Sequence, residues 1–249
     1  MSGHSKWAKI KHKKGAEDAK RGNLFTKLAR EIMAAAKEGG GNSDTNYRLR
    51  AAMNRAREYN MPSSNIDNAI KKGTGELPGI VYENVVFDAY GPGGAAILIE
   101  GLTDNKNRTT AEIRNILTKK NGNMAGAGST AFMFTKKGYV VIEKSKTNED
   151  QLIEIAIDVG TEDPQLEGDA WEVACEPASF DALKAALLAQ NIPTQSAEIT
   201  MLPTTKVKVT GNDARNLLAL MEALEEQEDV QNVYSNFDIS EEDLAQAGS

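Results

Sequence analysis

Two histidines and one cysteine are the residues of this sequence best suited to nucleophilic or metal chemistry. His4 and His12 lie eight residues apart in a lysine-rich stretch, without the carboxylate neighbours that metal-binding histidines normally have. Cys175 alternates with polar residues in step with Trp171 and Val173, a pattern that favours an inert thiol on the apolar face of a strand. No other histidine exists to complete a Ser/His/Asp or Cys/His arrangement. We therefore expect no enzyme active site, no metal and no cofactor.

Glycine-rich turns are the next candidates, because such turns can bind phosphate. Residues 72–75 end a predicted helix, whereas a phosphate-binding loop follows a strand and opens a helix. Residues 91–94 join two predicted strands and lack the Lys-Ser or Lys-Thr pair of a nucleotide-binding loop. Neither stretch indicates a nucleotide-binding enzyme.

Residues 4–14, with the sequence HSKWAKIKHKK, form a cationic arm suited to a polyanion. Lysines neutralise phosphates, and the flat indole of Trp7 can stack on a base or a ribose. The alternative is that Trp7 and Ile10 pack the arm onto the helices behind it while the lysines stay in water, and both arrangements can hold together. The nucleic-acid contacts expected in the arm are Lys6, Trp7, Lys9, Lys11, His12, Lys13 and Lys14.

Charge is divided unevenly along the chain. Residues 1–75 hold 16 Lys and Arg against 7 Asp and Glu, whereas residues 76–249 hold 13 against 29. The net charge of −7 thus joins a basic front part to an acidic body. This division favours a basic module that binds a polyanion. The alternative is that the lysines only keep the helices soluble, but in that case basic and acidic residues would tend to be mixed along the chain.

Hydrophobic spacing predicts three helices behind the arm. In residues 16–37 apolar side chains recur every three or four positions, which leaves a basic face toward solvent. A second helix is predicted from residue 44 or 45 to residue 59, and a third from the capping-box pair Ser64 and Asp67. Residues 1–75 are therefore expected to form a three-helix domain with the arm in front. The further nucleic-acid contacts expected on its first helix are Lys20, Arg21, Lys27 and Arg30.

From residue 80 onward, strands alternate with helices, so an α+β fold is expected. Residues 138–202 follow a strand–helix–strand–helix–strand order typical of a compact split βαβ unit. Residues 80–135 and 205–239 together supply the elements of a second α/β sandwich, in which residues 138–202 would be inserted as a third domain. Around the junction we expect two separate strands, at 130–134 and 139–143.

Two other segments are candidate contact sites. Residues 101–117 lead from a strand into a helix start, where free backbone N–H groups favour anions, and we expect Arg108 to contact nucleic acid there. Helix capping by Asn107 or Thr109 accounts for the neighbouring polar residues equally well. The glycine-rich residues 121–129 either reach into a groove or form an ordinary connection.

Several long motifs are distinctive in this sequence. They are GHSKWAKIKHKK from Gly3, NMPSSNIDNAIKKGTGE from Asn60, YGPGG from Tyr90 and TDNKNRT from Thr103. With these motifs the sequence resembles the YebC/PmpR family of probable transcriptional regulators, whose mitochondrial relatives are translational activators of cytochrome c oxidase. The resemblance covers nearly the whole chain and implies a helical bundle followed by two α/β domains, the last inserted in the second. It also implies a non-enzymatic, cytoplasmic protein that acts on gene expression.

The expected function is therefore a non-enzymatic, nucleic-acid-binding regulator of transcription, whose lysine-rich arm binds the phosphates of promoter DNA. The alternative is a ribosome-associated translation factor that binds ribosomal RNA and relieves stalling at proline-rich segments. A protein-interaction scaffold built on the acidic domains, and an unrecognised enzyme, are the rival classes. We expect a protein partner on the acidic domains, no membrane contact, and a location in the reducing cytoplasm, because the chain has one cysteine and no long apolar run.

Overall fold

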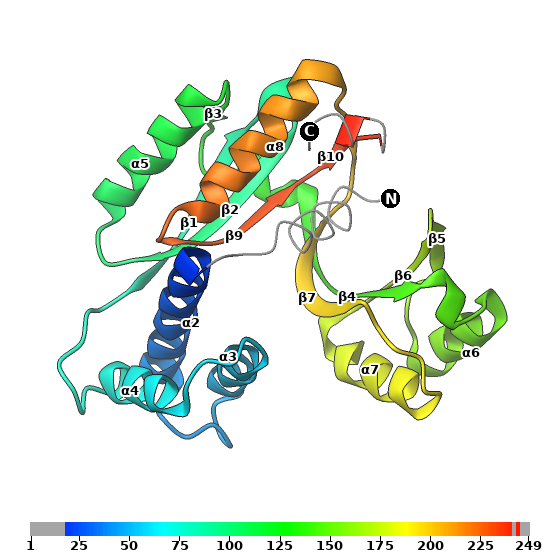
Figure 1. The fold of residues 1–249 in the computed structure, drawn as a ribbon, viewed down its shortest axis with the longest axis horizontal. Coiled ribbons are helices and arrows are strands. Elements are labelled where there is room, and N and C mark those ends of the chain that lie inside the picture. Colours follow the sequence, from blue (N-terminus) through cyan, green and yellow to red (C-terminus); the bar gives the residue numbers. More distant parts are fainter. Residues whose placement is uncertain (1–17, 241–242, 245–249) are drawn as a thin grey trace.

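The computed structural model describes residues 18–240 and 243–244, which form three lobes (Figure 1). A helical bundle comes first, and two sheet-containing domains follow, so the expected α+β class is confirmed. The cationic arm at residues 4–14 lies outside the described residues. Within the described part of the chain, no helix is long and apolar enough to cross a membrane.

Three helices pack around an aliphatic core in the first domain. They are α2 (Asp18–Gly39), α3 (Tyr47–Glu58) and α4 (Ser63–Thr74). The buried Asn46 caps α3, because its side chain accepts from the backbone N–H of Leu49 at 3.0 Å and donates to the carbonyl of Ala35 at 2.8 Å. The predicted start at residue 44 or 45 was therefore wrong by two or three residues. The capping box at Ser64 was also wrong, since α4 begins one residue earlier, after Pro62, without a side-chain cap.

The second domain is an antiparallel sheet covered on one face by two helices (Figure 1). Its strands lie in the order β3-β1-β2-β9, and side chains such as Ile99, Leu117 and Leu220 fill the core beneath the helices. Because β9 pairs with β2, the sheet joins two segments that are far apart in the chain. The elements are β1 (Glu83–Tyr90), β2 (Ala96–Thr103), α5 (Lys106–Lys119), β3 (Asn123–Met124), α8 (Gly211–Glu226) and β9 (Val230–Ser235), with the small parallel pair β8 (Val207–Lys208) and β10 (Phe237–Asp238) beside them.

The third domain has a sheet of order β5-β6-β4-β7 with two helices on one face. Its elements are β4 (Phe134–Glu143), α6 (Glu149–Val159), β5 (Gln165–Glu167), β6 (Ala170–Cys175), α7 (Phe180–Ala189) and β7 (Ser196–Pro203). Short 3-10 turns are η1 (Pro92–Gly94), η2 (Ala131–Met133), η3 (Lys144–Lys146) and η4 (Pro177–Ser179).

The second and third domains are connected by a continuous two-stranded ladder. Strand β4 pairs with β7 without a break from Phe134 to Val141, so the two strands predicted at 130–134 and 139–143 were wrong. The sequence pattern was misleading at Gly138, because a glycine between two apolar runs suggests a turn. In the structure a Cβ at Gly138 would lie 2.7 Å from Cys175 Sγ and 2.7 Å from the Phe180 ring, so this glycine makes room for core packing.

Candidate nucleic-acid interface

The expected contact residues of the first domain separate into two groups in the structure. Lys20 and Arg21 lie in the first turn of α2, and their side chains, like the arm, are outside what the structure describes. Lys27 and Arg30 follow on the same helix, and both reach the second domain. Their contacts decide whether they remain available to a ligand.

Arg30 is a buried arginine that joins the bundle to the end of α8. Its Nη1 donates to Asp229 Oδ1 at 2.8 Å and to the Glu228 carbonyl at 2.6 Å. Its guanidinium also lies 5.3 Å from the ring centre of Tyr82. Lys27 adds a second connection, because its Nζ donates to the Glu225 carbonyl in the last turn of α8 at 2.6 Å. These contacts join the two domains and give both cations partners within the chain.

Asp229 is the centre of this connection, which we call the latch (Arg30, Arg108, Thr109 and Asp229). Its Oδ2 accepts from Thr109 Oγ1 at 2.6 Å and from Arg108 Nη2 at 3.0 Å. Burial alone raises the pKa of Asp229, but the hydrogen bonds from Thr109 and Arg108, with the charges of Arg108 and Arg30, lower it below its ordinary value. Asp229 is therefore ionised at neutral pH and neutralises cations from two domains.

Arg108 serves the latch and does not stand free at a helix start. It also pairs with Asp104 at 2.7 Å, and its hydrogen bonds to Asp229 and Asp104 raise the pKa of the guanidinium. The helix is capped by Asn105, whose side chain accepts from the Arg108 backbone N–H at 3.1 Å, so the predicted caps Asn107 and Thr109 were wrong. The anion that this segment binds is a carboxylate of the same chain.

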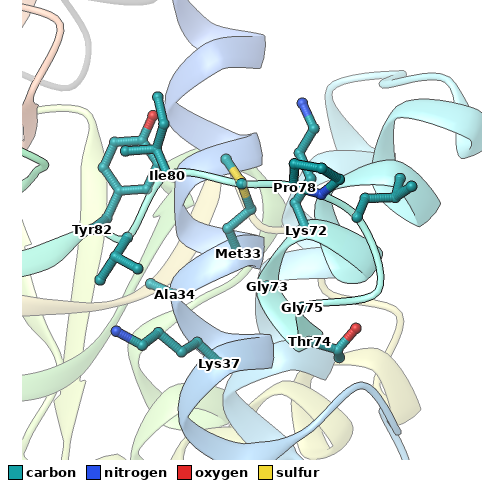
Figure 2. Close-up of a pocket in the computed structure, with 13 residues that line it drawn as sticks. Met33, Ala34, Lys37, Lys72, Gly73, Thr74, Gly75, Pro78, Ile80 and Tyr82 are labelled. Carbon is teal, nitrogen blue, oxygen red and sulfur yellow. The ribbon is translucent and has the colours of Figure 1, made fainter.

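A groove runs between α2, α4 and the linker of residues 76–82 on the same domain. It consists of two adjoining pockets that share Met33, Lys72 and Tyr82, and the first has a volume of about 350 Å³. The linker crosses the first pocket with Ile80 and Tyr82 near α2 and Pro78 near α4 (Figure 2). We call this feature the α2–α4 groove. Among the described residues, its lining includes lysines and amides but no carboxylate.

Gly73 sets the depth of this groove. A Cβ there would lie 2.5 Å from the Met33 carbonyl oxygen and 2.8 Å from the Ala36 Cβ. The absence of a side chain lets α4 approach α2 closely, which keeps the floor of the groove narrow.

The arginines of α3 contrast with the groove lysines. Arg48 pairs with Glu38, Arg55 pairs with Glu31 at 3.6 Å, and Arg50 donates to the carbonyls of residues 43 and 44. Each of these cations has a partner in the bundle itself. By comparison, Lys37 and Lys72 have no side-chain hydrogen bond or ion pair among the described residues.

Two family models together match most of the chain. The one described as the TACO1/YebC protein N-terminal domain matches residues 5–76, and the one described as the TACO1/YebC second and third domain matches residues 82–237. The chain belongs to the TACO1/YebC family. The resemblance indicated by the sequence motifs is thereby confirmed.

Other members of the TACO1/YebC family match the chain over its length. A probable transcriptional regulatory protein of Geobacter sulfurreducens is 53% identical over 244 residues, which cover 98% of each chain. Another of the same name from Dictyoglomus turgidum is 54% identical over 245 residues and also covers 98% of each chain. The crystal structure of a conserved hypothetical protein of Aquifex aeolicus, 41% identical, superposes with a TM-score of 0.77 and covers 90% of this chain and 93% of that one.

The glycine-rich residues 121–129 form an ordered connection in this family member. Strand β3 pairs with β1, and the buried Asp88 then binds the following turn through the backbone N–H groups of Gly128, Thr130 and Ala131 at 2.8–3.0 Å. Burial raises the pKa of Asp88, but these hydrogen bonds and that of the Thr130 hydroxyl lower it below its ordinary value. Of the two predictions, the structure favours the ordinary connection.

Metal-ligating side chains are not clustered in the described part of the chain. No group of three or more His, Cys, Asp or Glu side chains is placed there to hold a metal. Cys175 is buried, and burial raises the pKa of its thiol, which disfavours the reactive thiolate.

Sequence reasoning missed the groove. Its polar side chains on α4 include Asn65, Asn68 and Lys72, spaced at i, i+3 and i+7 on one helix face. That spacing was visible in the sequence, but asparagines in a helix suggest caps or solvated positions. The pocket exists only because α2 and the linker lie beside that face.

Proposed function

We propose that this protein is a non-enzymatic regulator of gene expression that binds nucleic acid through its N-terminal domain. The observation that carries the proposal is the set of basic side chains around the α2–α4 groove, which lacks carboxylates in a chain of net charge −7. A surface of this kind attracts phosphates, because Lys37 and Lys72 have no ion-pair partner among the described residues. The sequence of the cationic arm, residues 4–14, adds five lysines to the same domain.

The regulator role is supported by the relatives, which are named probable transcriptional regulatory proteins. Promoter DNA is the corresponding partner, with the arm on its phosphates. Lys27, Arg30 and Arg108 are not part of the proposed contact surface, because the latch and α8 already bind them.

A second candidate is a translation factor that binds ribosomal RNA. It is favoured by the dimensions of the α2–α4 groove, which suit an unpaired nucleotide better than a duplex. Both candidates use the same domain and the same charge, and they differ in the form of nucleic acid that is bound.

Gel-shift assays with promoter and scrambled duplexes, run beside ribosome co-sedimentation at several salt concentrations, test the proposal. About five phosphate contacts from the arm predict that log affinity for duplex DNA falls against log salt with a slope of about −4 to −5. Charge reversal of Lys9, Lys11, Lys13 and Lys14 should abolish most of this binding. Preference for the promoter supports the transcriptional role, and equal duplex affinities with strong ribosome binding support the translational one. Absence of retention on DNA, RNA and ribosomes in dilute buffer would overturn both.

A further inference from the structure

We propose that the α2–α4 groove is a binding site for unpaired nucleotides of single-stranded RNA. The inference rests on the proposed function and goes further, because it assigns base recognition to a groove that is separate from the arm. The groove residues that would contact the RNA are Met33, Lys37, Asn65, Asn68, Lys72 and Tyr82.

The charge of the groove favours an anionic ligand. Lys37 lines the first pocket and Lys72 lines both, and among the described residues no Asp or Glu lines either. Two ammonium groups without neutralising carboxylates favour an anion, and a phosphate chain can place charges at both ends of such a groove. An acidic ligand is therefore favoured over a neutral apolar one.

Amide side chains give the groove the means to recognise a base. Asn65 and Asn68 are exposed on the groove face of α4 and make no side-chain hydrogen bond among the described residues. Each amide offers two N–H donors and a carbonyl acceptor, which match the donor and acceptor pairs on base edges. A ligand that offered only phosphate groups would bind the lysines and leave the Asn65 and Asn68 amides without hydrogen-bond partners.

Apolar surface in the groove suits the flat face of a base. Met33 extends from α2 toward the linker, where Ile80 and Tyr82 lie (Figure 2). Ile80 is 57% exposed, an unusual position for an isoleucine in a short linker. Bases pack on apolar and aromatic side chains irrespective of their sequence, which contributes affinity to single-strand binding.

The size of the groove favours single strands. A pocket of about 350 Å³ is in the range of small-ligand sites, so it holds a nucleoside or a base that is free of its pairing partner. A duplex presents its base edges within a helix and cannot place a base there without unpairing it. Sequence-specific RNA recognition uses such unpaired bases, and for this reason we commit to single-stranded RNA.

Fluorescence anisotropy with the full chain tests the inference. The probes are a labelled 12-nucleotide mixed-sequence RNA, the matching abasic strand and the matching DNA strand. The groove variant is Asn68→Ala with Lys72→Ala, an i, i+4 pair near the end of α4. Its control is Asn115→Ala with Lys119→Ala, an exposed i, i+4 pair that likewise ends in the last turn of its helix, α5. Circular dichroism melts show whether the variants fold.

The groove variant should bind the RNA about tenfold more weakly, whereas the control changes affinity less than about twofold. The same substitutions should weaken binding of the abasic strand less than binding of the RNA, because the abasic strand makes only phosphate contacts and has no bases for the groove to bind. Wild-type RNA affinity in the folded groove variant would overturn the inference. Equal affinity for the DNA strand would overturn the commitment to RNA.

The charge-reversal variant of the arm (Lys9, Lys11, Lys13 and Lys14) separates this inference from the proposed function. If the arm charge-reversal variant loses binding while the groove variant keeps it, the groove inference fails and the proposed function stands. If wild-type protein binds none of the three strands and no duplex or ribosome, both fail.

Discussion

Arg30 and Lys37 lie two turns apart on helix α2, yet the structure uses their charges in opposite ways. Arg30 is buried against Asp229 in the latch, where its charge joins two domains. Lys37 lines the α2–α4 groove, which contains no carboxylate among the described residues. The cations of α2 therefore include one that joins two domains and one that has no side-chain partner among the described residues.

The two regions should respond differently to mutation. Removal of the buried Arg30 guanidinium leaves the buried Asp229 carboxylate with one cation fewer, so the loss appears in the free energy of unfolding. Removal of an exposed groove lysine costs little stability, because its charge is solvated in the free protein, and the loss appears in binding. Four predictions test this contrast, beginning with the largest expected effect.

Arg30→Ala should lower the free energy of unfolding by about 3 kcal/mol, because it breaks a buried ion pair from one side. Urea denaturation monitored by circular dichroism measures the change. Arg57→Ala, which removes an exposed arginine on α3, is the matched control and should cost less than about 0.5 kcal/mol. An Arg30 variant as stable as the control would show that the latch does not hold the domains together.

Gly73→Ala should destabilise the chain by about 2 kcal/mol, because the added methyl meets the Met33 carbonyl across the α2–α4 contact. The measurement is the shift in the thermal unfolding midpoint. Gly126→Ala serves as the control, because nothing lies within 4 Å of the Cβ position there. Equal midpoints for the two variants would contradict the close helix approach at the groove floor.

The latch should weaken in acid. The pKa of Asp229 is lower in the folded chain than in the unfolded one, so its stabilisation is present above about pH 4 and is lost as the pH falls through the folded value. Asp229→Asn should be less stable than wild type at pH 7, and the gap should narrow below about pH 4. Urea titrations across this range measure it. A gap that stays constant with pH would mean that the carboxylate charge does not stabilise the latch.

Lys37→Ala should have the smallest effect on the fold, a change of less than about 0.5 kcal/mol in the free energy of unfolding. Its effect on binding should be visible as a log–log salt slope that is smaller by about 1, the signature of one lost phosphate contact. Anisotropy titrations with single-stranded RNA at four salt concentrations measure the slope. An unchanged slope would remove Lys37 from the proposed interface.

Much of the fold could be predicted from the sequence, because hydrophobic spacing follows the local period of helices and strands. The strand–helix–strand–helix–strand order predicted for residues 138–202 is found in the third domain, where α6 and α7 alternate with its strands. Local reasoning failed where packing decides the residue type, as at Gly138, which makes room for Phe180 inside a continuous strand. The cap of α3 failed for a similar reason, since Asn46 is positioned by the carbonyl of Ala35 on another helix.

The candidate site was harder to predict than the fold. Arg30 looked like a solvent-facing cation because its partner Asp229 lies 199 residues further along the chain, where no local pattern can find it. The groove was missed because its α4 residues acquire a pocket only through α2 and the linker. Sequence charge thus indicated a basic surface on the N-terminal domain, and tertiary contacts show which of its cations already have partners within the chain.

Photocrosslinking of 4-thiouridine-substituted RNA to the full-length protein, followed by mass-spectrometric peptide mapping, tests the central claim most directly. The account predicts crosslinks in residues 61–82, which include α4 and the linker, and none in residues 225–231, which include the latch residue Asp229. Crosslinks confined to the acidic third domain, or to the latch, would contradict it.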